Sequence, residues 1–356
     1  MTAPSSLSHS LESLRKEVND LISQLPSMPH GSVIQQALMT LIRMAEVEAD
    51  RLDWKILNYA MRDMERAFRV FYPYRHVRKI TIFGSARIAP DTTEYQMAAE
   101  FARRIVQRGF MVMTGAGGGI MQAGNEGAGA AHSFGLNIQL PFEQGSNSFI
   151  EGDRKLINFK YFFTRKLFFL RETDALALFP GGFGTQDEAF ECLTLIQTGK
   201  SEPMPLVLID EPGHNYWRNW DTYIRENLLG SGLISPDDPY IYTITDNIDE
   251  ACEAITSFYR VFHSSRYVGD RLIIRLRSEL SDAAVESLND QFQDILITGR
   301  ITKSQALPEE TEEEIATLPR LALAFNQKDY GRLCQLIRTI NSLETAQPVA
   351  VHPEQK

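Results

Sequence analysis

Apolar residues recur every three or four positions over the first quarter of the chain. The repeat begins at Leu11 and Leu14, breaks at Pro26, and resumes over residues 33–71. This spacing places the apolar side chains on one face of a helix. We therefore predict a helical N-terminal extension over residues 1–76, acting as a cap or an oligomerisation arm.

From residue 79 the pattern changes to short apolar runs that alternate with helical stretches. The predicted strands lie at residues 79–83, 110–114, 136–140, 174–179, 205–209 and 240–244. The predicted helices between and after them cover residues 94–108, a stretch ending near Gly135, 159–171, a stretch ending near Gly199, and 249–263. Such alternation is typical of βαβ units, whose parallel sheet is covered by helices on both faces. We assign this α/β domain to residues 77–264.

The C-terminal part of the chain has a different order of elements. Strands are predicted at 271–276 and 321–325, and helices at 281–295 and 330–342. Ser281 is a candidate N-cap for the first of these helices. We predict a small α+β appendage over residues 265–345, with an acidic exposed loop at 308–314 and a disordered tail at 346–356.

Composition narrows the possible partners and compartments. The chain has 46 Asp and Glu against 36 Lys and Arg, giving a net charge of −10. An acidic balance argues against nucleic acid as the main partner. The three cysteines are far apart, which fits neither a disulfide framework nor a zinc site. No signal peptide and no membrane span are expected, so we predict a cytoplasmic protein.

Two glycine-rich loops follow predicted strands, where parallel sheets bind their ligands. The first, Gly115-Ala116-Gly117-Gly118-Gly119, departs from the dinucleotide fingerprint, because Ile120 replaces its third glycine and no acidic residue ends the next strand. Tight helix–strand packing is the alternative explanation. The second loop, Pro180–Thr185, lacks the lysine of an ATP-binding P-loop. Together the two loops favour a phosphorylated ligand.

Thr185 and Glu188 have the spacing of a helix capping box, which is one explanation for them. The other is that Glu188 supports an oxocarbenium-like transition state or activates water. Arg165 and Lys166 lie upstream in a helix crowded with phenylalanines. The pair is either a solvated helical pair or a set of buried cations that need an anionic partner, such as a nucleotide phosphate or Glu188.

These residues resemble the hallmarks of the Lonely Guy (LOG) family. The stretch Pro180-Gly181-Gly182-Phe183-Gly184-Thr185-Gln186-Asp187-Glu188 is similar to its P-G-G-x-G-T-x-x-E motif, and Arg165-Lys166 is similar to its upstream Arg-Lys pair. Gly84-Ser85 resembles the family's first nucleotide loop, and Gly117-Gly118-Gly119-Ile120-Met121 a shortened form of the second. Thr194 matches a family threonine near the substrate.

The resemblance implies a Rossmann-like homodimer, or a higher assembly, with phosphoribohydrolase activity. Such an enzyme converts a nucleoside 5′-monophosphate, of the AMP or cytokinin ribotide type, into free base and ribose 5-phosphate, without a metal or organic cofactor. It implies catalytic roles for Glu188 and Arg165. The implied substrate-binding residues are Gly84, Ser85, Gly117, Gly118, Gly119, Met121, Lys166, Gly181, Gly182, Gly184, Thr185 and Thr194.

The segment 141–147 departs from the pattern of short family members, so the base preference stays open. Glu143 and Asn147 are its candidates for substrate contacts. The extra terminal segments suggest an alternative function, a non-catalytic nucleotide sensor that signals through those extensions.

Overall fold

The computed structural model describes residues 13, 15–20, 28–47, 49–140, 145–310, 315–343 and 345. The chain divides into two compact units, Met1–Arg62 and Asp63–Lys356. The first unit contains α2 (Gly31–Glu46) and the beginning of α3 (Arg51–Phe71), and residues 13 and 15–20 are also helical. No helix in the described part of the chain combines the length and apolar character needed to cross a membrane.

The second unit is built around a seven-stranded parallel sheet with strand order β4-β3-β2-β1-β5-β6-β7. Its strands are β1 (Lys79–Phe83), β2 (Met111–Thr114), β3 (Ser133–Ile138), β4 (Leu156–Phe159), β5 (Ala175–Leu178), β6 (Leu206–Ile209) and β7 (Tyr242–Thr245). Strands β2, β3 and β4 follow one another on one side of β1, and β5, β6 and β7 follow one another on its other side. The strand order therefore reverses between β1 and β5, the place where open parallel sheets bind ligands.

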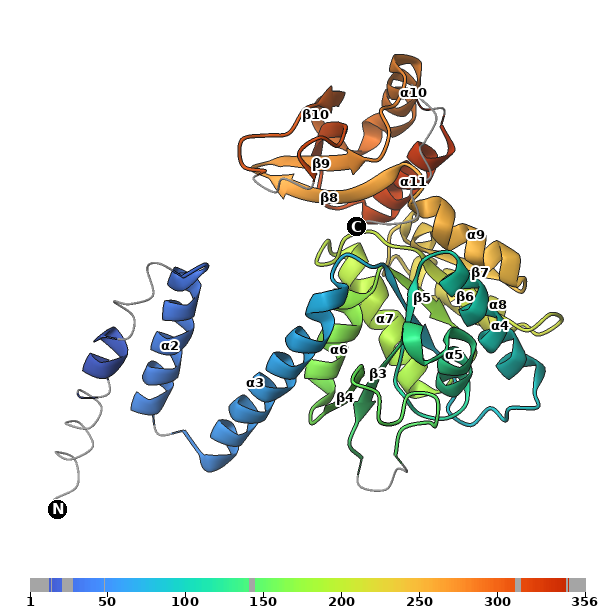
Figure 1. Ribbon diagram of the computed structural model, residues 1–356. Coiled ribbons are helices and arrows are strands. Elements are labelled where there is room, and N and C mark those ends of the chain that lie inside the picture. The colour runs from blue at the N-terminus through green and yellow to red at the C-terminus, as the bar shows by residue number, and fades with distance from the viewer. Residues whose placement is uncertain are drawn as a thin grey trace. The chain divides into compact units, whose positions relative to one another are not determined.

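Helices cover both faces of this sheet (Figure 1). Successive strand residues point to opposite faces, so Leu176 and Leu178 enter one core and Ala175 and Ala177 the other. The first face packs against the end of α3 together with α6 (Phe162–Glu172), α7 (Phe183–Gln197) and α8 (Tyr216–Tyr223). The second packs against α4 (Thr93–Gln107), α5 (Ile120–Ala128) and α9 (Ile248–Phe258). The predicted α/β class with a parallel sheet is confirmed.

The appendage is a four-stranded antiparallel sheet of order β10-β11-β9-β8, and helices α10 and α11 lie beside it (Figure 1). Its elements are β8 (Phe262–Val268), β9 (Arg271–Leu276), α10 (Asp282–Phe292), β10 (Leu296–Ser304), β11 (Arg320–Phe325) and α11 (Tyr330–Ser342). The two helices share a separate hydrophobic core with β9 and β11. The predicted N-cap at Ser281 is confirmed, because its side chain accepts a hydrogen bond from the Ala284 N–H.

Several predicted element boundaries were wrong. Residue 159 ends strand β4, and the following helix begins only at Phe162. Helix α9 ends at Phe258 instead of 263, because the chain turns there into β8. Short helical turns complete the fold at Tyr72–Tyr74, Ala130–His132, Ile224–Leu229, Asp238–Ile241 and Gln293–Ile295. Residues 311–314 of the predicted acidic loop and the predicted tail, 346–356, lie outside the described residues.

Candidate active site

The loops that follow β1, β2 and β5 meet at the carboxyl edge of the sheet. The Ser85 N–H donates a hydrogen bond to the Pro180 carbonyl (2.9 Å), and the Ile120 N–H donates one to the Ser85 carbonyl (3.0 Å). Glycine allows this close approach. A methyl group on Gly84 would lie 2.7 Å from the Ile120 side chain, and one on Gly119, whose φ is +61°, would lie 2.2 Å from the Ser85 carbonyl oxygen. The predicted glycine loops are thus brought together as one backbone cradle.

The second glycine loop leads directly into helix α7. Gly182 is the N-cap residue and makes no side-chain cap, and the helix begins at Phe183. The capping-box explanation is therefore wrong, because Thr185 lies inside the first turn and Glu188 in the second. Gly182, Phe183 and Gly184 are exposed. The first N–H groups of a helix lack partners within it, so this end of α7 offers donors to an anion.

Glu188 lies buried on α7 beneath this exposed helix end. Only 5% of the residue is exposed, and within the described part of the chain its Oε2 has no hydrogen-bond partner. Burial raises the pKa of Glu188 to about 7, against the opposing effect of the positive charges of Lys166 and Arg165. A buried carboxyl oxygen without a donor is costly in a finished core, and it is typical of a site that completes its contacts with a ligand.

Arg165 and Lys166 both come from the first half of α6, but their side chains take different directions. Lys166 Nζ bridges two carboxylates of α7, at 2.7 Å from Asp187 Oδ2 and 2.5 Å from Glu191 Oε2. The Arg165 guanidinium lies over the Phe162 ring, 4.9 Å from its centroid. Its Nη1 also lies beside Gly115, 3.9 Å from where a methyl group would stand. Arg165 therefore borders both the first glycine loop and Glu188.

The segment that leads into helix α6 is held by a residue that sequence reasoning missed. The Asp63 carboxylate on α3 accepts hydrogen bonds from the Lys160 N–H (3.0 Å), the Tyr161 N–H (3.3 Å) and the Thr164 hydroxyl (2.8 Å). Tyr161, the N-cap residue by position, contributes no side-chain cap. Asp63 is far from α6 in the sequence, so no local pattern could have indicated this contact.

A buried amide network supports the first glycine loop from below. Asn147 Nδ2 donates to the Gly117 carbonyl (3.0 Å) and to Asn125 Oδ1 (3.0 Å), and its backbone N–H donates to the Ala116 carbonyl (2.8 Å). Thr114 Oγ1 donates to the same Asn125 oxygen. Ala116 has a φ of +62°, a conformation that costs energy for any residue except glycine. The network thus fixes the loop shape, and Asn147 acts on it through the backbone.

The predicted site residues Met121, Thr194 and Glu143 lie in different surroundings. Met121 packs beneath the first loop, where its Sδ would lie 2.6 Å from a methyl group on Gly115. Thr194 is exposed, and its hydroxyl donates to the Phe190 carbonyl. Six residues along α7 put Thr194 about 9 Å from Glu188 and on a different side of the helix. Glu143 lies outside the described residues.

Tyr216, at the start of α8, is a further contact that the sequence did not indicate. Its hydroxyl donates to the Gly181 carbonyl (2.5 Å) and accepts from Gln186 Nε2 (2.7 Å). The hydroxyl joins the loop before α7 to the first turn of that helix. Tyr216 therefore helps to fix the backbone from which the α7 N–H groups project.

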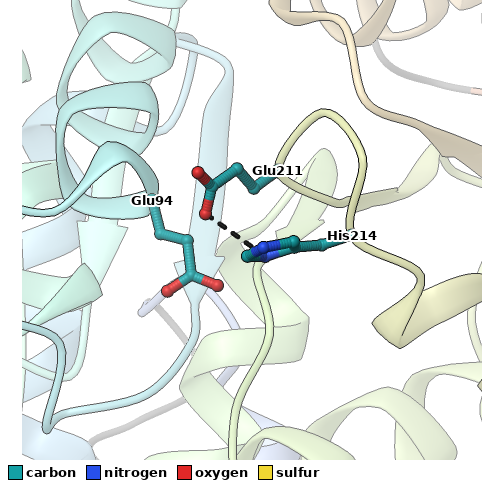
Figure 2. Close-up of side chains that lie close together, drawn as sticks. All are labelled: Glu94, Glu211 and His214. Atoms are coloured by element: carbon teal, nitrogen blue, oxygen red, sulfur yellow. Dashed lines mark ion pairs between the residues drawn. The ribbon is translucent and has the colours of Figure 1, made fainter.

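Among the described residues, one group of side chains has the spacing of a metal site. Glu94 at the start of α4 and Glu211 and His214 in the loop after β6 offer ligand atoms within 4.8 Å of one another. Figure 2 shows the three side chains converging, with the Glu211–His214 ion pair at 3.3 Å. Burial, followed by the negative charge of Glu211, raises the pKa of Glu94. The cluster could supply ligands to a divalent cation, although His214 is largely exposed.

Sequence comparison relates the sheet domain to a known family. Residues 113–255 match the family described as "Possible lysine decarboxylase". A cytokinin riboside 5′-monophosphate phosphoribohydrolase of Mycobacterium tuberculosis is 28% identical over 166 residues, which cover 45% of this chain and 83% of that protein. A probable cytokinin riboside 5′-monophosphate phosphoribohydrolase, LOG4, of Oryza sativa subsp. japonica is 25% identical over 186 residues, covering 51% and 77%.

Solved structures match about half of the chain at lower identity. A molybdenum cofactor carrier protein from Chlamydomonas reinhardtii is 19% identical, covers 50% of this chain and 95% of its own, and has a TM-score of 0.35. DNA processing protein A from Helicobacter pylori is 15% identical, covers 50% and 80%, and also has a TM-score of 0.35. At these identities nothing about function follows. The family match and the two sequence relatives instead confirm the resemblance of the sheet domain to the LOG family.

Proposed function

We propose that the chain is a phosphoribohydrolase, which hydrolyses the N-glycosidic bond of a nucleoside 5′-monophosphate to free base and ribose 5-phosphate. The observation that carries the proposal is Glu188, a buried carboxylate with a raised pKa and an unpaired oxygen among the described residues. It lies under the exposed N-terminus of α7, and the positive charge of Arg165 favours its ionised form. The two LOG-family relatives are named for this reaction.

The proposed binding mode places the 5′-phosphate at the N-terminus of α7. Its backbone N–H groups and the helix dipole favour a dianion there. Gly182 and Gly184 leave room for it, since a methyl group on either would meet no atom within 4 Å. With the phosphate at the helix end, the ribose lies over Glu188 in the second turn.

In the proposed reaction, the bond between ribose C1′ and the base nitrogen breaks, and its electron pair leaves with the base. The ribosyl group becomes oxocarbenium-like, and the Glu188 carboxylate stabilises that positive charge. A water oxygen then bonds to C1′ and transfers one of its protons to Glu188. The departing base takes up a proton from solvent, and Glu188 returns its proton to solvent. Arg165 orients Glu188 and the substrate from the side of the first glycine loop.

We also propose that the chain forms a homodimer through α6. Phe162, Phe163 and Leu167 on this helix are 51%, 56% and 47% exposed, and Phe190 on α7 is 38% exposed. Apolar side chains gathered on neighbouring helices are typical of an interaction surface. A twofold dimer would bury this surface against its own copy.

The sensor function remains a second candidate because the appendage packs directly onto α7. A methyl group on Gly199, which follows α7, would lie 2.0 Å from the Tyr330 hydroxyl of α11. A ligand-dependent movement of α7 would therefore reach the appendage. In this function the chain would bind a nucleotide without cleaving it.

A substrate panel separates the two functions. Purified protein is incubated with AMP and the other common nucleoside 5′-monophosphates, and released base and ribose 5-phosphate are quantified chromatographically. The enzyme function predicts equimolar release of both products from at least one monophosphate. Adenosine is the control, and its release rate should be far lower because it lacks the phosphate that α7 binds. Tight binding of a monophosphate with no release from any of them would support the sensor.

A further inference from the structure

A cavity of about 510 Å³ lies at the opposite, amino edge of the parallel sheet, where the sheet meets the appendage. Arg78 directly precedes β1, and Asp174 directly precedes β5. On the far side, His263 and Arg275 come from β8 and β9. The strands are four or five residues long, so this cavity is roughly 15 Å from the glycine loops that follow them.

The lining of the cavity is rich in cationic side chains. It contains three arginines and two carboxylates, and Arg275 pairs with the buried Glu310 at 2.7 Å. The arginines come from three different elements: Arg78 before β1, Arg171 at the end of α6, and Arg275 in β9. These arginine side chains are hydrogen-bond donors that the cavity offers to an anion.

Arg78 is incompletely satisfied by the protein. Its Nη2 is buried and, within the described ranges, has no hydrogen-bond acceptor. Its Nη1 is 3.4 Å from Asp174 Oδ1, a long ion pair, and its guanidinium lies 3.6 Å from the centroid of the Tyr259 ring. Asp174 also accepts a hydrogen bond from the Lys79 N–H at 2.8 Å. A buried guanidinium with an unused donor gains stability from an additional acceptor.

A fourth arginine, Arg277, lies close enough to Arg78 for their charges to interact. Burial, followed by the positive charge of Arg78, lowers the pKa of Arg277 to about 10. Arg277 does not line the cavity, but its positive charge interacts with that of Arg78, which does.

We propose that this cavity is a second ligand site that binds a small phosphorylated anion through Arg78, Arg171 and Arg275. Arginine forks match the oxygens of a phosphate group bidentately, and three of them can share a ligand with more than one phosphate. The volume lies within the range of small-molecule sites and exceeds what a single phosphate ion fills. The site is separate from the candidate active site and does not depend on its activity.

The test is calorimetric titration of the full chain with inorganic pyrophosphate, with inorganic phosphate in a parallel titration. We expect saturable binding of pyrophosphate that is tighter than that of phosphate. Arg171→Gln should weaken pyrophosphate binding at least tenfold, because this side chain lines the cavity, is 51% exposed and forms its ion pair with the neighbouring Glu172. Arg78→Gln should weaken it as well.

Arg225→Gln is the matched control. Arg225 is similarly exposed (53%) and pairs with a carboxylate on its own helix, but it does not line the cavity. The Arg225→Gln variant should bind pyrophosphate with the affinity of the unaltered chain. Thermal unfolding of each variant without ligand identifies any loss of fold, and Arg171→Gln keeps the test valid if Arg78→Gln unfolds. No saturable binding, or equal affinity in Arg171→Gln and Arg225→Gln, would overturn the proposal. Binding that is lost only on substitution at the glycine loops would assign the anion to the other edge.

Discussion

Glu188 is the residue on which the proposed chemistry depends, and its protonation sets the expected pH profile. The charged groups that act on it are Lys166 and Arg165 on α6 and Asp187 and Glu191 on its own helix. Burial outweighs the two cations and raises its pKa to about 7. The proposed reaction needs the carboxylate, which forms as the pH rises through that value.

We therefore predict that kcat/KM for AMP increases with pH and reaches half of its plateau near pH 7. The pH dependence of kcat/KM reports the pKa values of groups in the free enzyme, and here the group is Glu188. The measurement is a series of initial rates between pH 5 and 9. A profile already flat from pH 5 would mean that Glu188 is fully ionised there, and a rate that falls as the pH rises through 7 would require its protonated form.

Among single residues, those of the family motifs could be predicted from the sequence. The residues whose side chains fix the backbone around those motifs could not. Glu188 and Arg165 could be named because the family motif includes them. Asp63 and Tyr216 could not, because each acts through one hydrogen-bonding side chain on backbone groups distant in the sequence. Asn147 was predicted as a substrate contact, and the structure adds its support of the first glycine loop.

At the scale of elements, the two glycines before α7 have different tasks. A methyl group on Gly181 would lie 2.1 Å from Thr185 Oγ1, whereas one on Gly182 would meet no atom within 4 Å. We predict that Gly181→Ala displaces the start of α7 and lowers kcat/KM at least about tenfold, since small displacements of catalytic groups greatly reduce the reaction rate. Gly182→Ala should fold with the same thermal midpoint as the unaltered chain. Equal kcat/KM in the unaltered chain and Gly181→Ala would contradict the close packing of this loop.

Helix α6 gives a second prediction at this scale, because a residue of α3 holds the segment that leads into it. Removing the Asp63 carboxylate leaves the Lys160 and Tyr161 N–H groups without their acceptor, whereas the Thr164 hydroxyl still reaches the Tyr161 carbonyl at 2.9 Å. We predict that Asp63→Ala lowers the free energy of unfolding by about 1–2 kcal/mol, the usual cost of leaving hydrogen-bond donors without their acceptor. Urea unfolding measures it. Glu65→Ala is the control, because Glu65 lies on α3 and makes only an exposed pair with Arg69 among the described residues. Equal losses in the two variants would remove Asp63 from this role.

The elements found from the sequence are those with continuous apolar runs. Strands β1, β2, β5 and β6 are buried at every position, and each was predicted. Strand β4 escaped prediction because it has four residues and alternate burial, and β8 and β10 escaped because they are polar strands at the edges of their sheet. Edge strands are paired on one side only, so their sequences carry little of the apolar signal.

At the scale of the whole molecule, the exposed apolar side chains of α6 predict self-association. We expect the 40.3 kDa chain to have about twice that mass in solution, or a higher multiple, by light scattering. Leu167→Glu should shift the mass towards that of the monomer, because it places a charge in the apolar surface. Ile297→Glu is the matched control on the appendage, where Ile297 is 64% exposed, and should leave the mass unchanged. A monomeric unaltered chain would contradict the proposed dimer.

The central proposal is that this LOG-like domain cleaves nucleoside monophosphates with Glu188. Its most direct test is the rate of adenine release from AMP by the unaltered chain and by Glu188→Gln, with Glu253→Gln as a control on the exposed face of α9. The account predicts release by the unaltered chain and by Glu253→Gln, and a rate at least about 100-fold lower for Glu188→Gln with its fold and ribose 5-phosphate binding retained. Full activity in Glu188→Gln would contradict it.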